Sequence, residues 1–342
     1  MPQLDHGNNL NLDVISIGNA IVDILVVVDD EFLEEHNLVK STMRLCSAQE
    51  QQAILGGISE FSHASGGSAA NTVSSIAGLG AKAGFLGSIA NDHWGLMFEE
   101  SFKKTGVVIL VETIIDAELS TGTSAILVTP DSERTMNTHL GAAAYISRST
   151  IRPDIIKQTP ILFVEGYAFD KESAKDAMTT AVKLSQASGN RVAVTLSDPE
   201  CVNRHHADFV ELINEVDIVF ANEAEICRLW EIENQQIDEN IIEKYSKLTA
   251  PITVITQSER GCTVISEGNS FSLPAISPNK LIDVTGAGDQ FAAGFLFGLV
   301  RNWDLATSAK FGIELATLVI SRIGPRLEKY ELESALETFI NS

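Results

Sequence analysis

The residues best suited to chemistry lie in one stretch, LIDVTGAGDQFAAGF, at positions 281–295. Its first two residues are expected to end a short apolar strand, and Gly286 and Gly288 then flank Ala287 before a helix-forming run. Glycines let successive backbone N–H groups point into one concavity, and a helix start adds partial positive charge there. The pattern therefore predicts an anion site made of backbone. Asp289 sits just inside this site, so it either caps the helix or acts as a base on a nearby group.

A second glycine pair occurs nearer the N-terminus, in the segment SGGSAAN at positions 65–71. Gly66 and Gly67 precede Ser68, and the small residues that follow predict a helix reaching residue 79. Such a turn exposes N–H groups for the close approach of a ligand. The alternative is an ordinary flexible turn in which Ser68 caps the helix.

Polar residues also interrupt or follow several apolar strands. Asn19 and Asp23 fall within an otherwise apolar β region, where they face either solvent or a ligand. Asn222 and Glu225 follow a predicted strand and open a helix, where acidic residues often only complement the helix dipole. Arg134 lies at a polar hairpin tip, where a solvated charge is the simpler interpretation.

The two glycine segments together resemble the signatures of the ribokinase (PfkB) family of carbohydrate and nucleoside kinases. Positions 283–289, DVTGAGD, are similar to its C-terminal signature, whose last Asp is the catalytic base, and positions 65–71 to its N-terminal signature. The similarity extends from Asn19 to Gly324 and implies a Mg²⁺–ATP-dependent phosphotransferase. It assigns the base to Asp289, acting with the N–H groups of the preceding turn, which come from Gly286, Ala287 and Gly288.

The resemblance also implies an acceptor site and a nucleotide site. The acceptor residues would be Asn19, Asp23, Gly66, Gly67, Ser68, Asn71, Arg134 and Tyr167, with Tyr167 placed to stack on a purine. The nucleotide residues would be Asn222, Glu225, Thr256, Gly261, Asp283 and Thr285. Asn222 and Glu225 match the Asn-x-x-Glu motif that organises Mg²⁺ in the family, so Glu225 would act on the metal through water. A K⁺ requirement is left open.

Within the family, three segments favour adenosine kinases over sugar kinases. They are GNAIVDI at 18–24, the acidic stretch at 28–33 and the segment at 134–144. The expected reaction is therefore phosphorylation of the 5′-hydroxyl of adenosine to AMP, a purine-salvage step. A ribokinase- or fructokinase-like sugar kinase is the alternative. A non-catalytic ligand sensor of this fold would have no need of a base such as Asp289.

Apolar strands and helices alternate along the C-terminal half, which predicts a parallel sheet covered by helices on both faces. The expected fold is α/β, with a doubly wound, mostly parallel, ribokinase-like sheet in a single domain of residues 1–342. Polar β segments do not fit such a sheet, so residues of about 20–48 and 110–142 are assigned to a small β lid. The resemblance implies that this lid closes over the substrate. The predicted strands are 161–164, 191–196, 218–221 and 252–256, and the helices are 171–187, 207–213, 224–230 and 238–248.

The charge composition disfavours some classes of binding partner. Lys plus Arg number 24 against 46 Asp plus Glu, a net charge of −22, which disfavours nucleic acid and anionic membrane surfaces. Neither a signal peptide nor an apolar run of membrane-spanning length is evident. The four cysteines are scattered without zinc-site spacing, as in a reducing compartment. We therefore expect a cytoplasmic monomer or homodimer that binds a small-molecule substrate.

Overall fold

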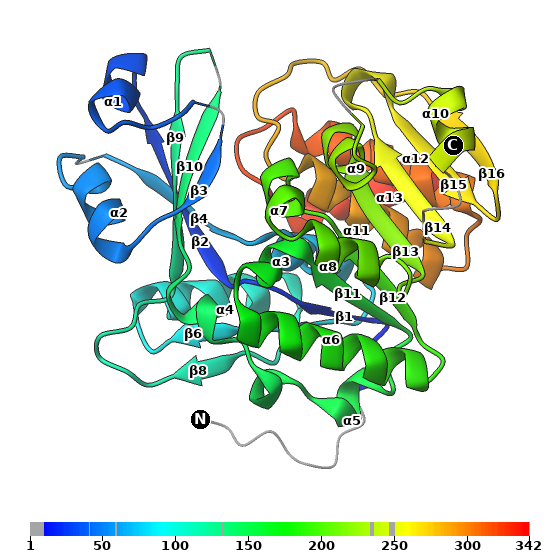
Figure 1. The fold of residues 1–342 in the computed structure, drawn as a ribbon, viewed down its shortest axis with the longest axis horizontal. Helices are drawn as coiled ribbons and strands as arrows, with labels where there is room; N and C mark the ends of the chain where they lie inside the picture. Colours follow the sequence, from blue (N-terminus) through cyan, green and yellow to red (C-terminus); the bar gives the residue numbers. More distant parts are fainter. Residues whose placement is uncertain are drawn as a thin grey trace.

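The computed structural model describes residues 10–40, 42–58, 60–131, 133–232, 236–245 and 250–341. Within these residues, nine strands form a central sheet in the order β16-β15-β14-β13-β12-β11-β1-β5-β7 (Figure 1). The pairs from β14 to β7 are parallel, whereas β15 and β16 add antiparallel pairs at one edge. The expected α/β fold with a mostly parallel sheet is confirmed. The strands are β1 (Val14–Ile17), β5 (Ala83–Leu86), β7 (Val108–Ile109), β11 (Ile161–Glu165), β12 (Arg191–Thr195), β13 (Ile218–Asn222), β14 (Ile252–Thr256), β15 (Cys262–Ser266) and β16 (Asn269–Leu273).

The central strands supply two hydrophobic cores, one on each face of the sheet. On β11, Leu162 and Val164 belong to one core, and Ile161 and Phe163 belong to the other. Side chains alternate between the faces of a strand, so a strand buried on both sides reads as a continuous apolar run. The first core includes α5 (Pro153–Ile156), α6 (Glu172–Ala187), α7 (Pro199–Arg204), α8 (His206–Leu212), α9 (Glu223–Leu229) and α10 (Glu239–Tyr245). The second includes α3 (Ser68–Gly78), α4 (His93–Thr105), α11 (Ala287–Val300) and α12 (Leu305–Val319), while α13 (Lys329–Ile340) packs against α12 in a third cluster.

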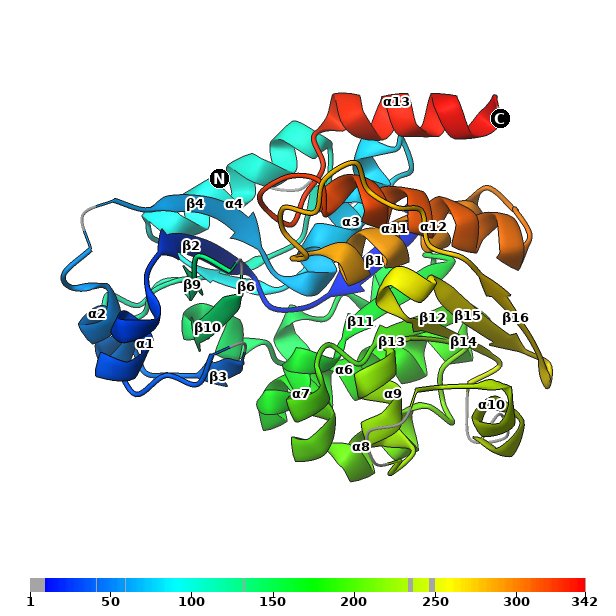
Figure 2. The ribbon, with the colours of Figure 1, turned by 90° about the horizontal axis from the view of Figure 1, so that it is seen from above.

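A second sheet, separate from the first, lies beside the main body in both views (Figures 1 and 2). Among the described residues its order is β3-β10-β9-β2-β4, formed by β2 (Ile21–Val27), β3 (Met43–Leu45), β4 (Ser62–Gly66), β9 (Gly122–Val128) and β10 (Arg134–His139). Ile24, Val26 and Leu127 pack with α1 (Asp30–Glu35) and α2 (Ala48–Leu55), which therefore cover one face. Strand β4 lies outside the two segments assigned to a lid, and β8 (Glu112–Ile114) pairs with β6 (Ser88–Ala90) rather than with this sheet.

The predicted strand end at residues 281 and 282 is wrong. This segment belongs to no strand, because the N–H groups of Ile282 and Asp283 both donate to the carbonyl of Ile320 rather than to a neighbouring strand. The helix predicted at 238–248 is α10, which ends at Tyr245, and residues 246–248 of that prediction lie outside the described residues. In the described part of the chain, no helix is long and apolar enough to cross a membrane.

Candidate active site

Helix α11 begins directly after a glycine in the left-handed conformation. Gly286 has φ of 78°, and a Cβ at this position would lie 2.5 Å from the carbonyl oxygen of Pro325. Both the backbone angle and the lack of space require glycine here. Among the described residues no side chain caps this helix end, and Gly288 in the first turn is exposed. The first-turn N–H groups of α11 can therefore bind an anion.

The carboxylate of Asp289, in this first turn, is held by the start of α3. Ser68 Oγ donates to its Oδ1 at 2.7 Å, and Asn71 Nδ2 donates to its Oδ2 at 2.8 Å. Burial raises the pKa of Asp289 to about 6, although both hydrogen bonds and Arg326 oppose the rise. The fold thus brings the two glycine segments together, with a carboxylate of raised pKa between them. Such a group can accept a proton near neutral pH.

Asp23 lies on β2, opposite the glycine turn that precedes α3. Its side chain is buried, and a Cβ at Gly66 would lie 2.3 Å from the nearer carboxylate oxygen. Burial raises the pKa of Asp23 to about 7, against the opposing charge of Arg326, with Asp289 raising it further. A solvent-facing position is therefore excluded for Asp23. The close backbone approach at Gly66 explains why this turn needs glycine.

Asn19 is buried at the end of β1, beside the same turn. A Cβ at Gly67 would lie 2.3 Å from the backbone oxygen of Asn19. The Asn19 N–H donates to Glu165 Oε1 at 2.6 Å, and the Ala69 N–H donates to Glu165 Oε2 at 2.8 Å. One buried carboxylate therefore fixes the end of β1 to the start of α3. Burial raises the pKa of Glu165 to about 7, despite these two hydrogen bonds.

Arg134 joins the second sheet to the loop ahead of α11. Its guanidinium forms an ion pair with Asp283, which also accepts from the N–H groups of Thr285 and Gly324, both at 2.7 Å. Arg134 Nε and Nη1 are buried, and neither has a hydrogen-bond partner among the described residues. A solvated turn charge is therefore excluded. Unpaired buried N–H groups are unfavourable, so these two donors are suited to an anionic ligand.

Asn222 and Glu225 form a capping box at the start of α9. Asn222 is exposed, whereas Glu225 is buried beneath it, with Oε2 accepting from the Asn222 N–H at 3.0 Å and Oε1 from Asn222 Nδ2 at 2.6 Å. Burial raises the pKa of Glu225 to about 8. Within the described ranges, no three His, Cys, Asp or Glu side chains are grouped to hold a metal ion. This arrangement fits an ion that carries its own waters and phosphate ligands, because Mg²⁺ needs few protein carboxylates.

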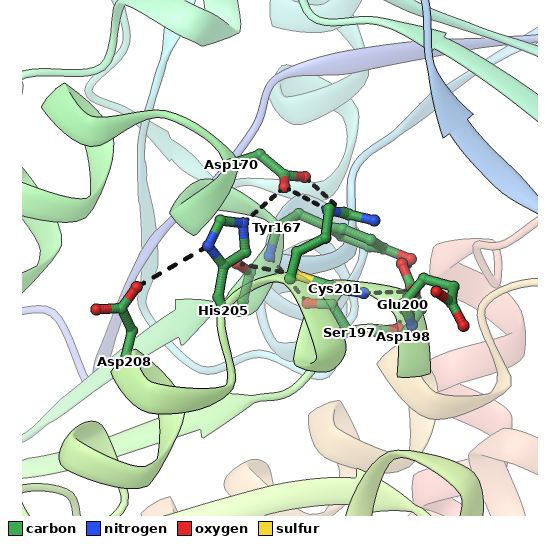
Figure 3. Close-up of polar contacts among 10 residues, drawn as sticks. Tyr167, Asp170, Ser197, Asp198, Glu200, Cys201, His205 and Asp208 are labelled. Carbon is green, nitrogen blue, oxygen red and sulfur yellow. Dashed lines mark hydrogen bonds and ion pairs between the residues drawn. The ribbon is translucent and has the colours of Figure 1, made fainter. Parts of the chain in front are cut away.

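Tyr167 contacts Ser197, which follows β12. Tyr167 itself follows β11, and its hydroxyl donates to the carbonyl of Ser197 at 3.4 Å (Figure 3). Figure 3 also shows His205 beside Asp170, with 2.8 Å between Nε2 and Oδ1, so His205 is partly buried and hydrogen-bonded rather than a free surface residue. Thr256 ends β14, and Gly261 closes the turn after it with φ of 96°.

Two residues of the site were missed by reasoning from the sequence. Glu165 precedes Gly166 at a strand end, which is a weak signal that the chain turns toward the ligand-binding edge. Arg326 follows Gly-Pro without a recognisable motif, and its contacts with Asn71, Ser101 and Gly66 could not be foreseen.

Comparison with known proteins decides the family. The model of the pfkB family carbohydrate kinases matches residues 38–330. The chain belongs to the pfkB family. It is therefore an ATP-dependent kinase, and its mostly parallel α/β fold is that of the family.

Relatives within the pfkB family differ in acceptor. The adenosine kinase of Saccharomyces cerevisiae is 24% identical over 330 residues, covering 91% of this chain and 96% of that protein. The 5-dehydro-2-deoxygluconokinase of Bacillus subtilis is 26% identical over 317 residues, covering 91% and 90%. Among solved structures, an adenosine kinase from Sinorhizobium meliloti has a TM-score of 0.89 and 36% identity, covering 96% of this chain and 99% of that one. A probable sugar kinase from Rhizobium etli CFN 42 has a TM-score of 0.88 and 33% identity, covering 96% and 98%.

The buried Glu165 carboxyl predicts a measurable pH dependence of stability. Its pKa is about 7 in the folded protein against an ordinary value of 4.5, so the folded state binds the extra proton between these values and loses stability as the pH rises through them. Glu165→Gln has no such proton. The stability of the wild type relative to Glu165→Gln should therefore fall by roughly 1–3 kcal/mol from pH 5 to pH 8.

Urea unfolding of both proteins at several pH values measures this difference. Glu112→Gln, which removes an exposed carboxylate, controls for the change of net charge. A stability difference that stays constant or grows with pH would contradict the assignment.

Proposed function

We propose that this kinase transfers the γ-phosphoryl group of ATP to the 5′-hydroxyl of adenosine and so forms AMP. The observation that supports it is the placement of Asp289, held by Ser68 and Asn71 at the anion-binding turn, on the side of the site where Asp23 lies. A base, an anion site and a second carboxylate for the acceptor hydroxyls are what this reaction needs. Phosphoryl transfer depends mainly on positioning and electrostatic stabilisation.

In the proposed reaction, the acceptor hydroxyl donates its proton to Asp289 as its oxygen attacks the γ-phosphorus in line. The phosphoryl group sits against the N–H groups of Gly286, Ala287 and Gly288 at the start of α11, where the Ala287 N–H also donates to the carbonyl of Val284 at 3.3 Å. Arg134 adds its unpartnered N–H groups to the same charge. The leaving group is ADP, and the proton on Asp289 is later released to solvent.

Mg²⁺ bound to the phosphates would neutralise charge on the transferring group. Asn222 would hold it through water, with Glu225 fixing the orientation of that amide from below. The base of ATP would lie near the exposed apolar side chains Leu281, Val284 and Ile323, on segments joined by the hydrogen bond from Gly324 N–H to Asp283. Thr256 and Gly261 are assigned to the same nucleotide side.

The face of the second sheet that points away from α1 and α2 supports a nucleoside as the acceptor. Strand register places Asp23, Ser124 and Thr138 in one row across β2, β9 and β10. Two residues along each strand, on the same face, comes an apolar row of Leu25, Ile126, Met136 and Met43. A carboxylate next to an apolar row fits a ribose diol next to a base, whereas a free sugar would leave the apolar row without a partner.

The second sheet acts as a lid in this proposal. Arg134 starts β10 on the same face, and its ion pair with Asp283 ties the sheet to the loop ahead of the anion turn. Holding the sheet over the acceptor would exclude water, so that ATP is not simply hydrolysed. Asn19, Gly66 and Gly67 form the floor of the acceptor site. Tyr167 has no assigned contact with the base, because it lies against Ser197.

A sugar acceptor is the second candidate. The Rhizobium etli structure, described as a probable sugar kinase, is 33% identical, and the Sinorhizobium meliloti adenosine kinase is 36% identical. Release of ADP with adenosine, ribose, fructose and 5-dehydro-2-deoxygluconate separates the two. Faster turnover of a sugar than of adenosine would replace the nucleoside proposal.

Asp289→Asn keeps the volume of the side chain and removes the base, so kcat should fall by about 10²–10⁴-fold. Nucleoside binding, followed by calorimetry, should survive, because the anion turn and Asp23 are untouched. Asp304→Asn is the matched control, since Asp304 caps α12 at a distance from the site by accepting from the Thr307 N–H at 2.7 Å. If Asp289→Asn turned over at the wild-type rate, Asp289 would not be the base and would serve only the start of the helix.

Glu225→Gln should raise the Mg²⁺ concentration needed for half-maximal rate, with little effect on acceptor affinity. In the wild type, both carboxylate oxygens of Glu225 accept hydrogen bonds from Asn222, one from its N–H and one from its Nδ2. A glutamine side chain has only one acceptor oxygen, so it can keep only one of these bonds with its oxygen, and Asn222 loses its orientation. Glu50→Gln alters the equivalent capping box of α2 and should leave the Mg²⁺ titration unchanged. An unchanged titration in Glu225→Gln as well would show that the box merely caps α9.

Asp23→Ala tests the acceptor. A carboxylate can accept from the 2′- and 3′-hydroxyls together, and a site built for both rejects an analogue that lacks one. The wild type should therefore favour adenosine over 2′-deoxyadenosine in kcat/KM, by roughly 10²-fold or more. Asp23→Ala should remove most of that preference by lowering the rate with adenosine. An equal preference in both proteins would show that Asp23 does not bind the diol.

A further inference from the structure

Arg326 lies behind the acceptor residues, on the segment between α12 and α13. Its Nε donates to Asn71 Oδ1 at 2.8 Å, Nη1 to Ser101 Oγ at 3.2 Å and Nη2 to the carbonyl of Gly66 at 3.2 Å. The guanidinium also stacks over the ring of Phe102, 5.4 Å from its centroid. One side chain from the C-terminal part of the chain therefore contacts the glycine turn, α3 and α4 together.

These contacts fix which way the Asn71 amide points. A guanidinium only donates, so the amide oxygen must face Arg326 and the amide nitrogen must face Asp289. Asn71 Nδ2 does donate to Asp289 Oδ2, at 2.8 Å. The reversed amide would place its NH₂ group against the guanidinium and its oxygen against the carboxylate. The two hydrogen bonds from Arg326 to Asn71 and from Asn71 to Asp289 therefore run in one direction and end on a carboxylate acceptor.

The charges around Asp289 give these two hydrogen bonds an electrostatic role. The charge of Asp289 raises the pKa of three buried carboxyls, those of Asp23 on β2, Glu165 on β11 and Glu225 on α9. Arg326 is the opposing charge that acts on both Asp289 and Asp23. Burial lowers the pKa of Arg326 to about 10, so it stays cationic at neutral pH.

We propose that Arg326 is a positioning residue for phosphoryl transfer, which orients Asn71 and keeps Asp289 ionised and ready to take the acceptor proton. This role rests on the proposed role of Asp289 as the base. The contact with the Gly66 carbonyl has a second effect, since it holds the glycine turn against Asp23. In this role Arg326 acts through Asn71 and the glycine turn rather than on the reacting atoms.

The test compares Arg326→Met, which keeps the stem over Phe102, with Arg326→Lys, which keeps the charge but loses the Nε donor. Arg301→Met is the matched control, because Arg301 stacks over Phe297 at 5.2 Å on the surface, away from the site. The kcat/KM for the acceptor is measured from pH 5 to pH 9 at saturating Mg²⁺–ATP. Thermal unfolding checks that each variant is folded.

Arg326→Met should lower kcat/KM at pH 7 by roughly 10- to 100-fold. It should also shift the acid limb of the pH profile to higher pH by about one pH unit, because without the positive charge of Arg326 the pKa of Asp289 rises. Arg326→Lys should keep the limb nearer to that of the wild type and lose less activity. Combined with Asn71→Ala, Arg326→Met should add less than its separate effect, because both act through the same amide.

A folded Arg326→Met with an unchanged acid limb, or with an effect fully additive to Asn71→Ala, would overturn the proposal. If Arg326→Met does not fold, Arg326→Lys takes its place. An unchanged acid limb in its pH profile, or an effect fully additive to that of Asn71→Ala, would then overturn the proposal. The assay uses whichever acceptor the wild type phosphorylates, so a failure of adenosine leaves the test intact. A failure of the base assignment appears separately, as turnover by Asp289→Asn.

Discussion

Two hydrogen bonds to one carboxylate determine the geometry of the whole site. Ser68 and Asn71 lie 221 and 218 positions from Asp289 in the chain, yet they hold its two oxygens from the first turn of α3. A buried carboxylate is unfavourable unless it is hydrogen-bonded, so these donors make its position in the first turn of α11 tolerable. They can reach it only because α3 and α11 pack in the same core on one face of the central sheet. The site therefore depends on the fold rather than on either glycine segment alone.

In the proposed function, one sheet positions the residues of the transfer step and the other selects the acceptor. In the proposed reaction, the edge of the central sheet and the starts of α3 and α11 carry the base and the anion turn. The second sheet carries Asp23 and the apolar row beside it. Under the proposed function, changes in that row would alter the acceptor without disturbing the transfer step, in line with the general rule that one fold hosts different specificities. The net charge of −22 adds a second constraint, because the phosphates must be held by local donors such as Arg134.

Much of the fold follows from local patterns in the sequence. Strands β11 to β14 are short apolar runs, as expected of parallel strands buried on both faces, and their bounds in the structure differ little from those predicted. The anion turn was also visible, because glycine conformation is a local property. The contacts of Asp289 were not, since nothing local specifies that α3 will meet α11. Asn19 and Asp23 were ambiguous for the same reason: a polar residue in a strand faces solvent or a ligand according to what the rest of the chain places opposite it.

The misses have related causes. Residues 281 and 282 look like a strand, but the N–H groups of Ile282 and Asp283 donate to the carbonyl of Ile320, a contact with the end of a helix that composition does not reveal. Glu165 and Arg326 are single charged residues without a motif, and each gains its role from backbone or amide groups supplied by distant segments. Family resemblance points to residues of the reacting site, whereas the residues that orient them must be found from coordinates.

A crystal structure with adenosine and a non-hydrolysable ATP analogue would show whether Asp289 is placed as the base. The acceptor hydroxyl should lie within about 2.6–3.2 Å of an Asp289 carboxylate oxygen. The γ-phosphate should lie against the N–H groups that follow Gly286, with Asn71 still donating to Asp289. Adenosine bound elsewhere, or a phosphate bound away from the start of α11 with Asp289 facing only its own helix, would contradict this assignment.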